Sequence, residues 1–227
     1  MSETRPISAK TGVIKNADGS AYFKIGDTAA YAAVYGPREL HPRFMQNPKK
    51  GILRVTYAMM PFSGMGNRVR PGPNRRAKEI SMVIQKSLEP VIDLSEFPNS
   101  VVDVYVDLPE TDAGSRCACI CAASMALADA GIIMSDMVTA VSVGRVDDQV
   151  VVDLDYAEEA YPDGPVADIP VAMIPSTGEI TLLQLDGDID EKMLKTSLEM
   201  AQTACQEIKD VLITAVKQKY LDAENEE

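Results

Sequence analysis

The order of strand-like and helix-like segments constrains the fold of this 227-residue chain more than any other feature. Short runs rich in β-branched and aromatic residues predict strands, and apolar residues repeated every three or four positions predict helices. The strand pattern occurs at 12–16, 20–25, 28–36, 52–60, 101–110, 138–146, 149–156, 168–175 and 179–187. The helical pattern occurs at about 75–89, 115–130 and 189–219.

The first four strand segments predict a β-meander over about the first 60 residues, with Asp18-Gly19 as the turn between the first two. Asp147-Asp148 separates a later strand pair in the same way. Since no linker, repeat or low-complexity segment divides the chain, we expect one α+β domain over residues 1–227, with strands and helices in separate layers.

The first two predicted helices have clear ends. Asn74 is a good N-cap for the first helix, and Pro90 ends it. Gly131 is typical of the residue that follows a helix and ends the second. The stripe of the third helix, which includes Leu198, Cys205 and Leu212, predicts packing against a core or an interface.

Arginines at the first two helix starts predict a phosphate site. A helix start presents free backbone N–H groups to an anion, and the guanidinium fork of arginine matches phosphate oxygens. A lone arginine is more often an ordinary surface cation, but three at two helix starts, one of them beside Gly-Ser, favour an oxyanion ligand. The two segments are Arg75-Arg76 and Gly114-Ser115-Arg116.

The net charge of −12 is distributed unevenly. Residues 1–90 contain 15 lysines and arginines against 6 acidic residues, whereas residues 91–227 contain 7 against 28. Because salt screens exposed charges beyond about 8 Å, a basic region can bind a polyanion although the whole chain is acidic. We therefore expect a polyanion to bind the N-terminal half.

The remaining composition favours a cytoplasmic protein without a membrane anchor. No run of 18 apolar residues is present, and no apolar stretch follows the charges near the N-terminus. Cys117, Cys119 and Cys121 alternate within a predicted helix, where neighbours cannot form disulfides, and Cys205 is distant in sequence. A metal cluster is conceivable, but small buried side chains explain these cysteines better.

Five ordered motifs resemble the RNase PH superfamily over nearly the whole chain, and within it the catalytic subunits of archaeal exosomes. They are ADGSAYFKIGDTAAYAAVYGPREL, NRRAKEIS, ETDAGSR, VVDLDYAEE and ADIPVAMIPS. The resemblance implies the RNase PH fold, with a two-layer βαβα core of the ribosomal protein S5 domain 2-like type. It implies a 3′→5′ exoribonuclease that uses inorganic phosphate to release nucleoside diphosphates from single-stranded RNA.

The resemblance also implies partners and a cofactor. The partners are an inactive RNase PH-type paralogue, with which the chain would form a hexameric ring, and RNA-binding cap subunits. The cofactor is Mg2+, bound by a carboxylate. A non-catalytic scaffold subunit of the same ring and a free-standing tRNA-trimming RNase PH are the alternatives.

The resemblance assigns cations to two roles. It implies that Arg76 and the segment Gly114-Ser115-Arg116 bind phosphate, and that Arg75 contacts the RNA backbone. Arg68 and Arg70 lie in a loop rich in glycine and proline, which favours electrostatic RNA binding without sequence preference. Arg43 is a candidate for the same RNA path.

The acidic residues depart from the pattern of the family, because the loop before Asp168 is three residues longer than the family pattern. Asp168 matches the second family carboxylate and is the candidate metal ligand. Two residues remain open as the general acid, and the sequence favours Asp163 slightly over Glu159. Glu159 falls in the matching column, whereas Asp163 lies in a Pro-Asp-Gly turn that favours an inward carboxylate.

Overall fold

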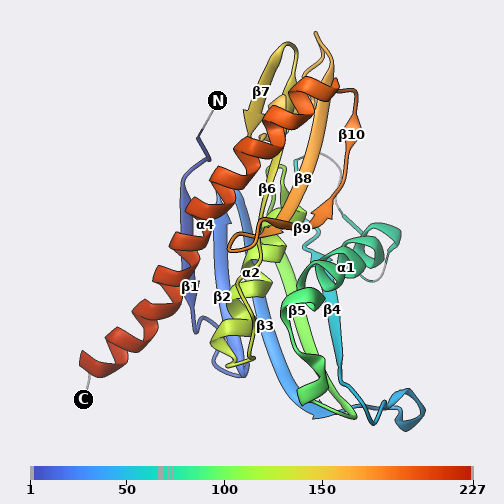
Figure 1. Ribbon diagram of the computed structural model, residues 1–227, viewed down its shortest axis with the longest axis vertical. Coiled ribbons are helices and arrows are strands. Elements are labelled where there is room, and N and C mark those ends of the chain that lie inside the picture. The colour runs from blue at the N-terminus through green and yellow to red at the C-terminus, as the bar shows by residue number, and fades with distance from the viewer. Residues whose placement is uncertain (1–2, 66–68, 71, 73, 226–227) are drawn as a thin grey trace.

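The computed structural model describes residues 3–65, 69–70, 72 and 74–225. Two five-stranded sheets enclose a central helix, and a long C-terminal helix crosses both sheets (Figure 1). The strands and helices lie in separate layers, as the predicted α+β fold requires. The prediction of a single domain over residues 1–227 stays a prediction.

The first sheet has the strand order β1-β2-β3-β5-β4. Its strands are β1 (Ile7–Thr11), β2 (Gly19–Ile25), β3 (Thr28–Glu39), β5 (Ser100–Glu110) and β4 (Ile52–Met59). The pairs β1–β2, β2–β3 and β3–β5 are antiparallel, and β4 is parallel to β5.

Two details of the predicted meander are wrong. The first strand is β1 and not 12–16, which forms the connection to β2; there the Ser20 hydroxyl accepts a hydrogen bond from the Ile14 N–H at 2.9 Å. The strand that begins at Ile52 does not continue the meander. It lies beyond β5, because the helix between β4 and β5 returns the chain in the same direction and parallel strands require such a crossover.

The second sheet is antiparallel, with the strand order β10-β8-β6-β7 and β9 also paired with β8. Its strands are β6 (Thr139–Val146), β7 (Gln149–Val152), β8 (Val166–Ile174), β9 (Glu179–Leu183) and β10 (Asp186–Gly187). The predicted Asp147-Asp148 turn is confirmed between β6 and β7, with Asp147 at a φ of 53°.

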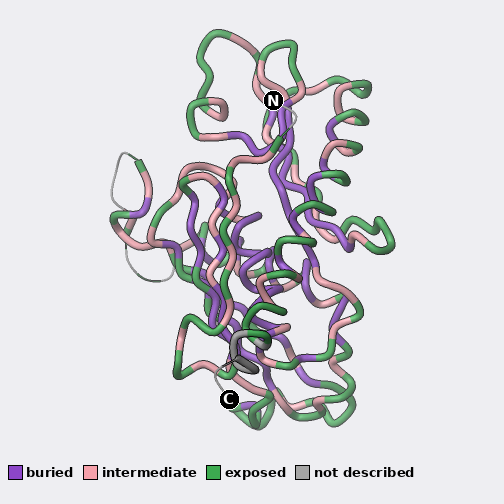
Figure 2. The backbone as a smooth tube through the Cα atoms, turned by 90° about the vertical axis from the view of Figure 1, so that its left-hand side faces the viewer, coloured by how far each residue is buried: buried purple, intermediate pink, exposed green. Residues whose placement is uncertain are grey.

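Helix α2 (Ser115–Asp129) forms the centre of the molecule and contacts strands of both sheets. Because it faces protein on nearly every side, almost all of its residues are buried (Figure 2). Its alanines and cysteines are small enough to let both sheets approach. Cys117, Cys119 and Cys121 are free and buried, and burial raises the pKa of each thiol, which confirms their prediction as buried small residues.

Three further helices complete the layers: α1 (Arg75–Leu88), the short α3 (Tyr156–Glu159) and α4 (Glu191–Asn225). Single turns of 3-10 helix lie at Arg43–Met45, Glu89–Val91 and Leu94–Glu96. Helix α1 packs against β4, and α4 packs across β1 and β6. Ala201, Cys205, Ile208 and Leu212 of α4 are buried, so the predicted stripe is core. Among the described residues, no helix is long and apolar enough to cross a membrane.

Candidate active site

A cavity of about 220 Å³ opens where the starts of α1 and α2 meet α3 and the second sheet. It brings together six residues that the sequence singled out: Arg76, Gly114, Ser115, Arg116, Glu159 and Asp168. Met59, Gly64, Met65, Val69, Thr111, Ala113, Tyr156 and Pro170 complete its lining. Cations therefore face carboxylates across a small cavity.

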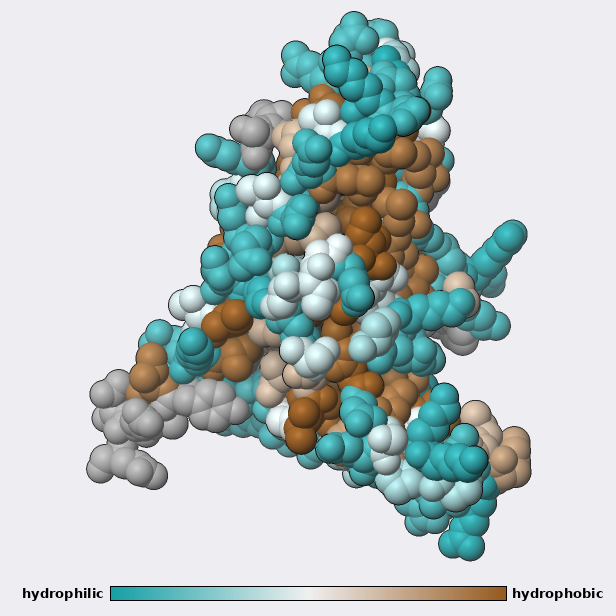
Figure 3. Space-filling model, viewed as in Figure 1, coloured by the Kyte–Doolittle hydropathy of each residue, from teal (hydrophilic) through white to brown (hydrophobic). Residues whose placement is uncertain are grey.

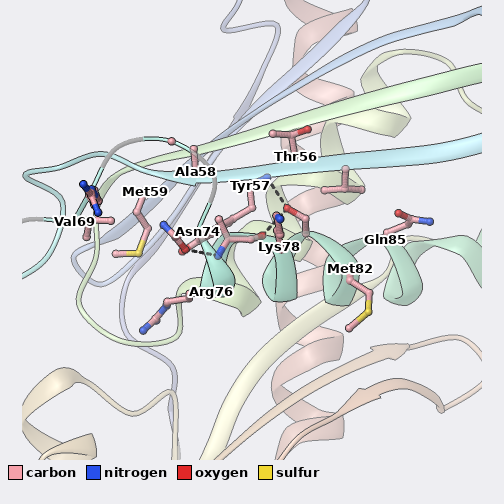
Figure 4. Close-up of a pocket in the computed structure, with 15 residues that line it drawn as sticks. Thr56, Tyr57, Ala58, Met59, Val69, Asn74, Arg76, Lys78, Met82 and Gln85 are labelled. Carbon is pink, nitrogen blue, oxygen red and sulfur yellow. Dashed lines mark hydrogen bonds between the residues drawn. The ribbon is translucent and has the colours of Figure 1, made fainter. Parts of the chain in front are cut away.

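The start of α1 has the predicted cap. The Asn74 side chain accepts a hydrogen bond from the Ala77 N–H at 2.7 Å, as the dashed line in Figure 4 shows. The cap fixes the first turn and therefore the point from which the exposed side chain of Arg76 extends. Arg75, the next residue towards the N-terminus, is exposed and does not line the cavity.

The start of α2 is a strained loop that other segments hold in place. Ala113 and Gly114 both have a φ of 60°, a conformation that a residue with a side chain rarely adopts. The Thr28 hydroxyl accepts from the Asp112 N–H at 2.8 Å and donates to the Ala113 carbonyl at 2.7 Å. Gly114 then caps α2, so the first N–H groups of the helix lack partners within the helix, and its first two residues, Ser115 and Arg116, line the cavity.

Arg5 joins this loop to the segment that leads to α3. Its NH1 group donates to the carbonyl and the carboxylate of Asp112, at 2.8 and 3.2 Å. Its Nε and NH2 groups donate to the buried carboxylate of Asp153, at 2.8 Å each. No local pattern in the sequence predicts this contact, because its three residues lie far apart in the chain.

The acidic side of the cavity is formed by Glu159, at the end of α3, and Asp168, in β8. The Ser142 hydroxyl donates a hydrogen bond to Asp168. Burial, followed by the charge and hydrogen bonding of Asp168, raises the pKa of Glu159 to about 7, against the effect of the two cavity arginines. Burial also raises the pKa of Asp168, although the Ser142 hydroxyl opposes it. With its pKa at about 7, Glu159 is therefore partly protonated near neutral pH.

Asp163, the alternative acid, is exposed in the loop between α3 and β8 and does not line the cavity. Arg43 is also exposed and pairs with Glu39 at 3.6 Å; it precedes β4, and the residue that lines the cavity is at the other end of this strand, Met59. Arg68 lies outside the described residues.

A second, mostly apolar groove of about 620 Å³ runs between β4 and α1 beside the cavity (Figure 4). Arg70, Arg76 and Lys78 are the cations that line it. Tyr57 also lines it, and the buried hydroxyl of this residue has no hydrogen-bond partner in the described part of the chain. Burial raises the pKa of Tyr57 to about 12, although Ser115 and Arg76 lie near enough to oppose the effect.

The cavity fits Mg2+ only if the substrate and water supply part of the coordination. No cluster of three His, Cys, Asp or Glu side chains suited to a metal occurs among the described residues, so a protein-only cage is not formed. Mg2+ commonly uses one or two carboxylates together with substrate phosphate and water. Asp168 and Glu159 line the same cavity as Arg76 and Arg116, so the carboxylates that such a site needs are present.

Two family models match the chain. The 3′ exoribonuclease family, domain 1, matches residues 3–133, and domain 2 of the same family matches residues 136–204. The exosome complex component Rrp41 of Methanopyrus kandleri is 46% identical over 218 residues, which are 96% of this chain and 90% of that protein. Rrp41 of Thermococcus kodakarensis is 46% identical over 219 residues, 96% of this chain and 86% of that protein.

Solved structures share the fold. The rice (Oryza sativa) Rrp46 structure has a TM-score of 0.83 at 24% identity and covers 95% of this chain and 96% of its own. A chain of the Archaeoglobus fulgidus exosome with RNA bound to the active site has a TM-score of 0.76 at 22% identity, with 92% and 89% covered. The fold and the two family models together define a phosphorolytic 3′ exoribonuclease of RNase PH architecture.

This chain belongs to the 3′ exoribonuclease family of RNase PH. It is accordingly an enzyme that degrades RNA from the 3′ end with phosphate as the attacking group.

Proposed function

We propose that this chain is the active subunit of an exosome ring, where it removes nucleotides from the 3′ end of single-stranded RNA as nucleoside diphosphates. The observation that carries the proposal is the single cavity in which Arg76 and Arg116 face Glu159 and Asp168. The relatives named as exosome components support the ring context. The reverse reaction, in which nucleoside diphosphates extend an RNA 3′ end, follows from the same geometry.

Phosphate binding is assigned to the two helix starts. Phosphorolysis brings inorganic phosphate close to the terminal phosphodiester, so the site must offset the repulsion between two anions. Arg76 and Arg116 supply positive charge, and the free N–H groups at the start of α2, next to Ser115, supply donors. Bidentate forks suit this ligand better than lysine, so Arg→Lys is not conservative here.

Proton transfer is assigned to Glu159. The departing ribose oxygen needs a proton, and a carboxyl group with a pKa near 7 is partly protonated at neutral pH and can supply it. The exposed position of Asp163 favours Glu159 over this alternative. Asp168, oriented by Ser142, would hold Mg2+. When bound, the metal spreads negative charge that develops on the phosphate oxygens.

RNA backbone binding is assigned to the exposed arginines of the basic half. Arg70 lines the groove that adjoins the cavity, and Arg75 lies at the same helix start as Arg76. Arg68 and Arg43 complete the proposed set. Such contacts bind phosphates without reading bases, so affinity should fall steeply with salt and show no sequence preference.

An exposed apolar surface supports a ring partner. Met82 of α1 and Ile180, Leu183 and Leu185 around β9 are each 45% to 50% exposed. Helix α1 contacts β9, and Figure 3 shows apolar surface along the middle of the face that carries β8 and its neighbours. A surface of this kind on one chain is typical of a protein interface. We propose an inactive RNase PH-type paralogue as the partner, with cap subunits on the ring.

The test measures products from single-stranded RNA, with the chain alone and with its paralogue, in phosphate and in phosphate-free buffer. Release of nucleoside diphosphates only in phosphate supports the proposal. No turnover in any combination indicates a non-catalytic scaffold, and a preference for tRNA 3′ ends by the chain alone indicates a free-standing RNase PH. Arg116→Ala should raise the phosphate concentration that turnover requires and should cut the rate by about 10²- to 10³-fold. Arg38→Ala is the matched control, since Arg38 is exposed, pairs with the exposed Asp18 at 3.5 Å and does not line the cavity.

A further inference from the structure

Gln184 occupies a fixed position beside the cavity, between β9 and β10. Its N–H donates to the carbonyl of Pro170 at 3.2 Å, and Pro170 lies in β8 two residues after Asp168. Because Pro170 also lines the cavity, this bond fixes the backbone of Gln184 close to the carboxylate side. The Gln184 side chain therefore starts from a defined point.

That side chain bridges the two helix starts. Its Oε1 atom accepts from NH1 of Arg116, in α2, at 2.6 Å. Its Nε2 atom donates to Glu79, in α1, at 3.4 Å. The amide has only one orientation that satisfies both neighbours, because a guanidinium can only donate and a carboxylate accepts. Gln184 thus presents its oxygen to Arg116.

We propose that Gln184 is a positioning residue that holds the Arg116 guanidinium ready for inorganic phosphate. The inference rests on the phosphate-binding role proposed for Arg116. With NH1 engaged by Gln184, the edge formed by Nε and NH2 makes no hydrogen bond in the described part of the chain. The two N–H groups of that edge can donate parallel hydrogen bonds to two phosphate oxygens. Fixing a long side chain before the ligand arrives removes part of the entropy loss on binding.

A neutral amide is the group that this position requires. A carboxylate at residue 184 would form an ion pair with Arg116 and compete with phosphate for the same guanidinium. It would also face the like charge of Glu79. An apolar side chain of similar length would leave Arg116 mobile but would add no competitor. A carboxylate at residue 184 should therefore weaken phosphate binding more than an apolar side chain does.

The experiment compares Gln184→Met and Gln184→Glu in the full-length chain, assembled with the paralogue if turnover requires it. Phosphate is varied at saturating RNA, and binding of inorganic phosphate is measured separately by calorimetry. Gln184→Met should raise the KM for phosphate about 3- to 10-fold, with kcat changed by less than about 2-fold. Gln184→Glu should raise that KM by more than about 10-fold. Affinity for RNA should not change in either variant.

The control is Gln206, which is exposed on α4 and lines neither the cavity nor the groove beside it. Gln206→Glu adds the same charge and should leave the KM for phosphate unchanged. Gln184 is partly exposed at the surface, so these variants should fold. A KM for phosphate equal to that of wild type in both Gln184 variants overturns the inference. If Arg116→Ala also leaves the phosphate dependence unchanged, the role of Arg116 fails as well.

Discussion

The replacement Glu159→Gln tests the acidic half of the site through stability as well as activity. The pKa of the Glu159 carboxyl group is raised from its ordinary value to about 7, so the folded chain binds this proton more tightly than the unfolded chain. The corresponding stability is fully present below about pH 4.5 and is lost as the pH rises through about 7. Glutamine is neutral at every pH, so the Glu159→Gln variant does not lose this stability as the pH rises.

The rise in the pKa of Glu159 from 4.5 to about 7 corresponds to at most about 3.4 kcal/mol, because a tenfold change in proton affinity is about 1.36 kcal/mol. Since Glu159 is only partly buried and couples to Asp168, we expect about 1–2 kcal/mol. In EDTA at pH 8, Glu159→Gln should therefore unfold about 2–8 °C above wild type, whereas at pH 4.5 the two should coincide. Thermal unfolding followed by circular dichroism between pH 4.5 and 8 measures the difference.

The same variant should lose turnover by about 10²- to 10⁴-fold, because the ribose oxygen would leave without a proton. Asp163→Asn is the matched control, since it also neutralises one carboxylate but in the exposed loop. It should keep wild-type turnover and the wild-type dependence of stability on pH. If the unfolding temperatures of wild type and Glu159→Gln change with pH in the same way, the claim that burial raises the pKa of Glu159 is refuted. Loss of turnover in Asp163→Asn alone would make Asp163 the acid.

Three further predictions concern single contacts. Tyr57→Phe removes a buried hydroxyl without a partner, so the unfolding free energy in urea should rise or stay within about 0.5 kcal/mol of wild type. Lys209→Met leaves the nearly buried Asp136 without its ammonium partner at 2.7 Å, and the same measurement should show a loss of about 3–5 kcal/mol; an unchanged midpoint would contradict it. EDTA should stop nucleoside diphosphate release and Mg2+ should restore it in wild type, whereas Asp168→Asn should bind RNA and stay inactive at any Mg2+ concentration.

Short sequence patterns were sufficient to predict the ends of the first two helices and the arginines that line the cavity. Asn74 caps α1, and Gly131 follows α2 with a φ of 74°, as the sequence predicts. A cap depends on hydrogen bonds within one turn, so its residues identify it without the rest of the fold. Arg76 and Arg116 could be singled out for the same reason.

Tertiary structure decided which distant segments meet. The sequence places β4 after β3, but only the crossover through α1 sets it beside β5. Glu159 and Asp163 are both acidic residues before the same strand, and only the packing of α3 directs Glu159 to the cavity. Gln184 has no motif of its own, because its role depends on Arg116, 68 residues away in sequence. Contacts of this kind depend on strand pairing and burial, which no short stretch of residues specifies.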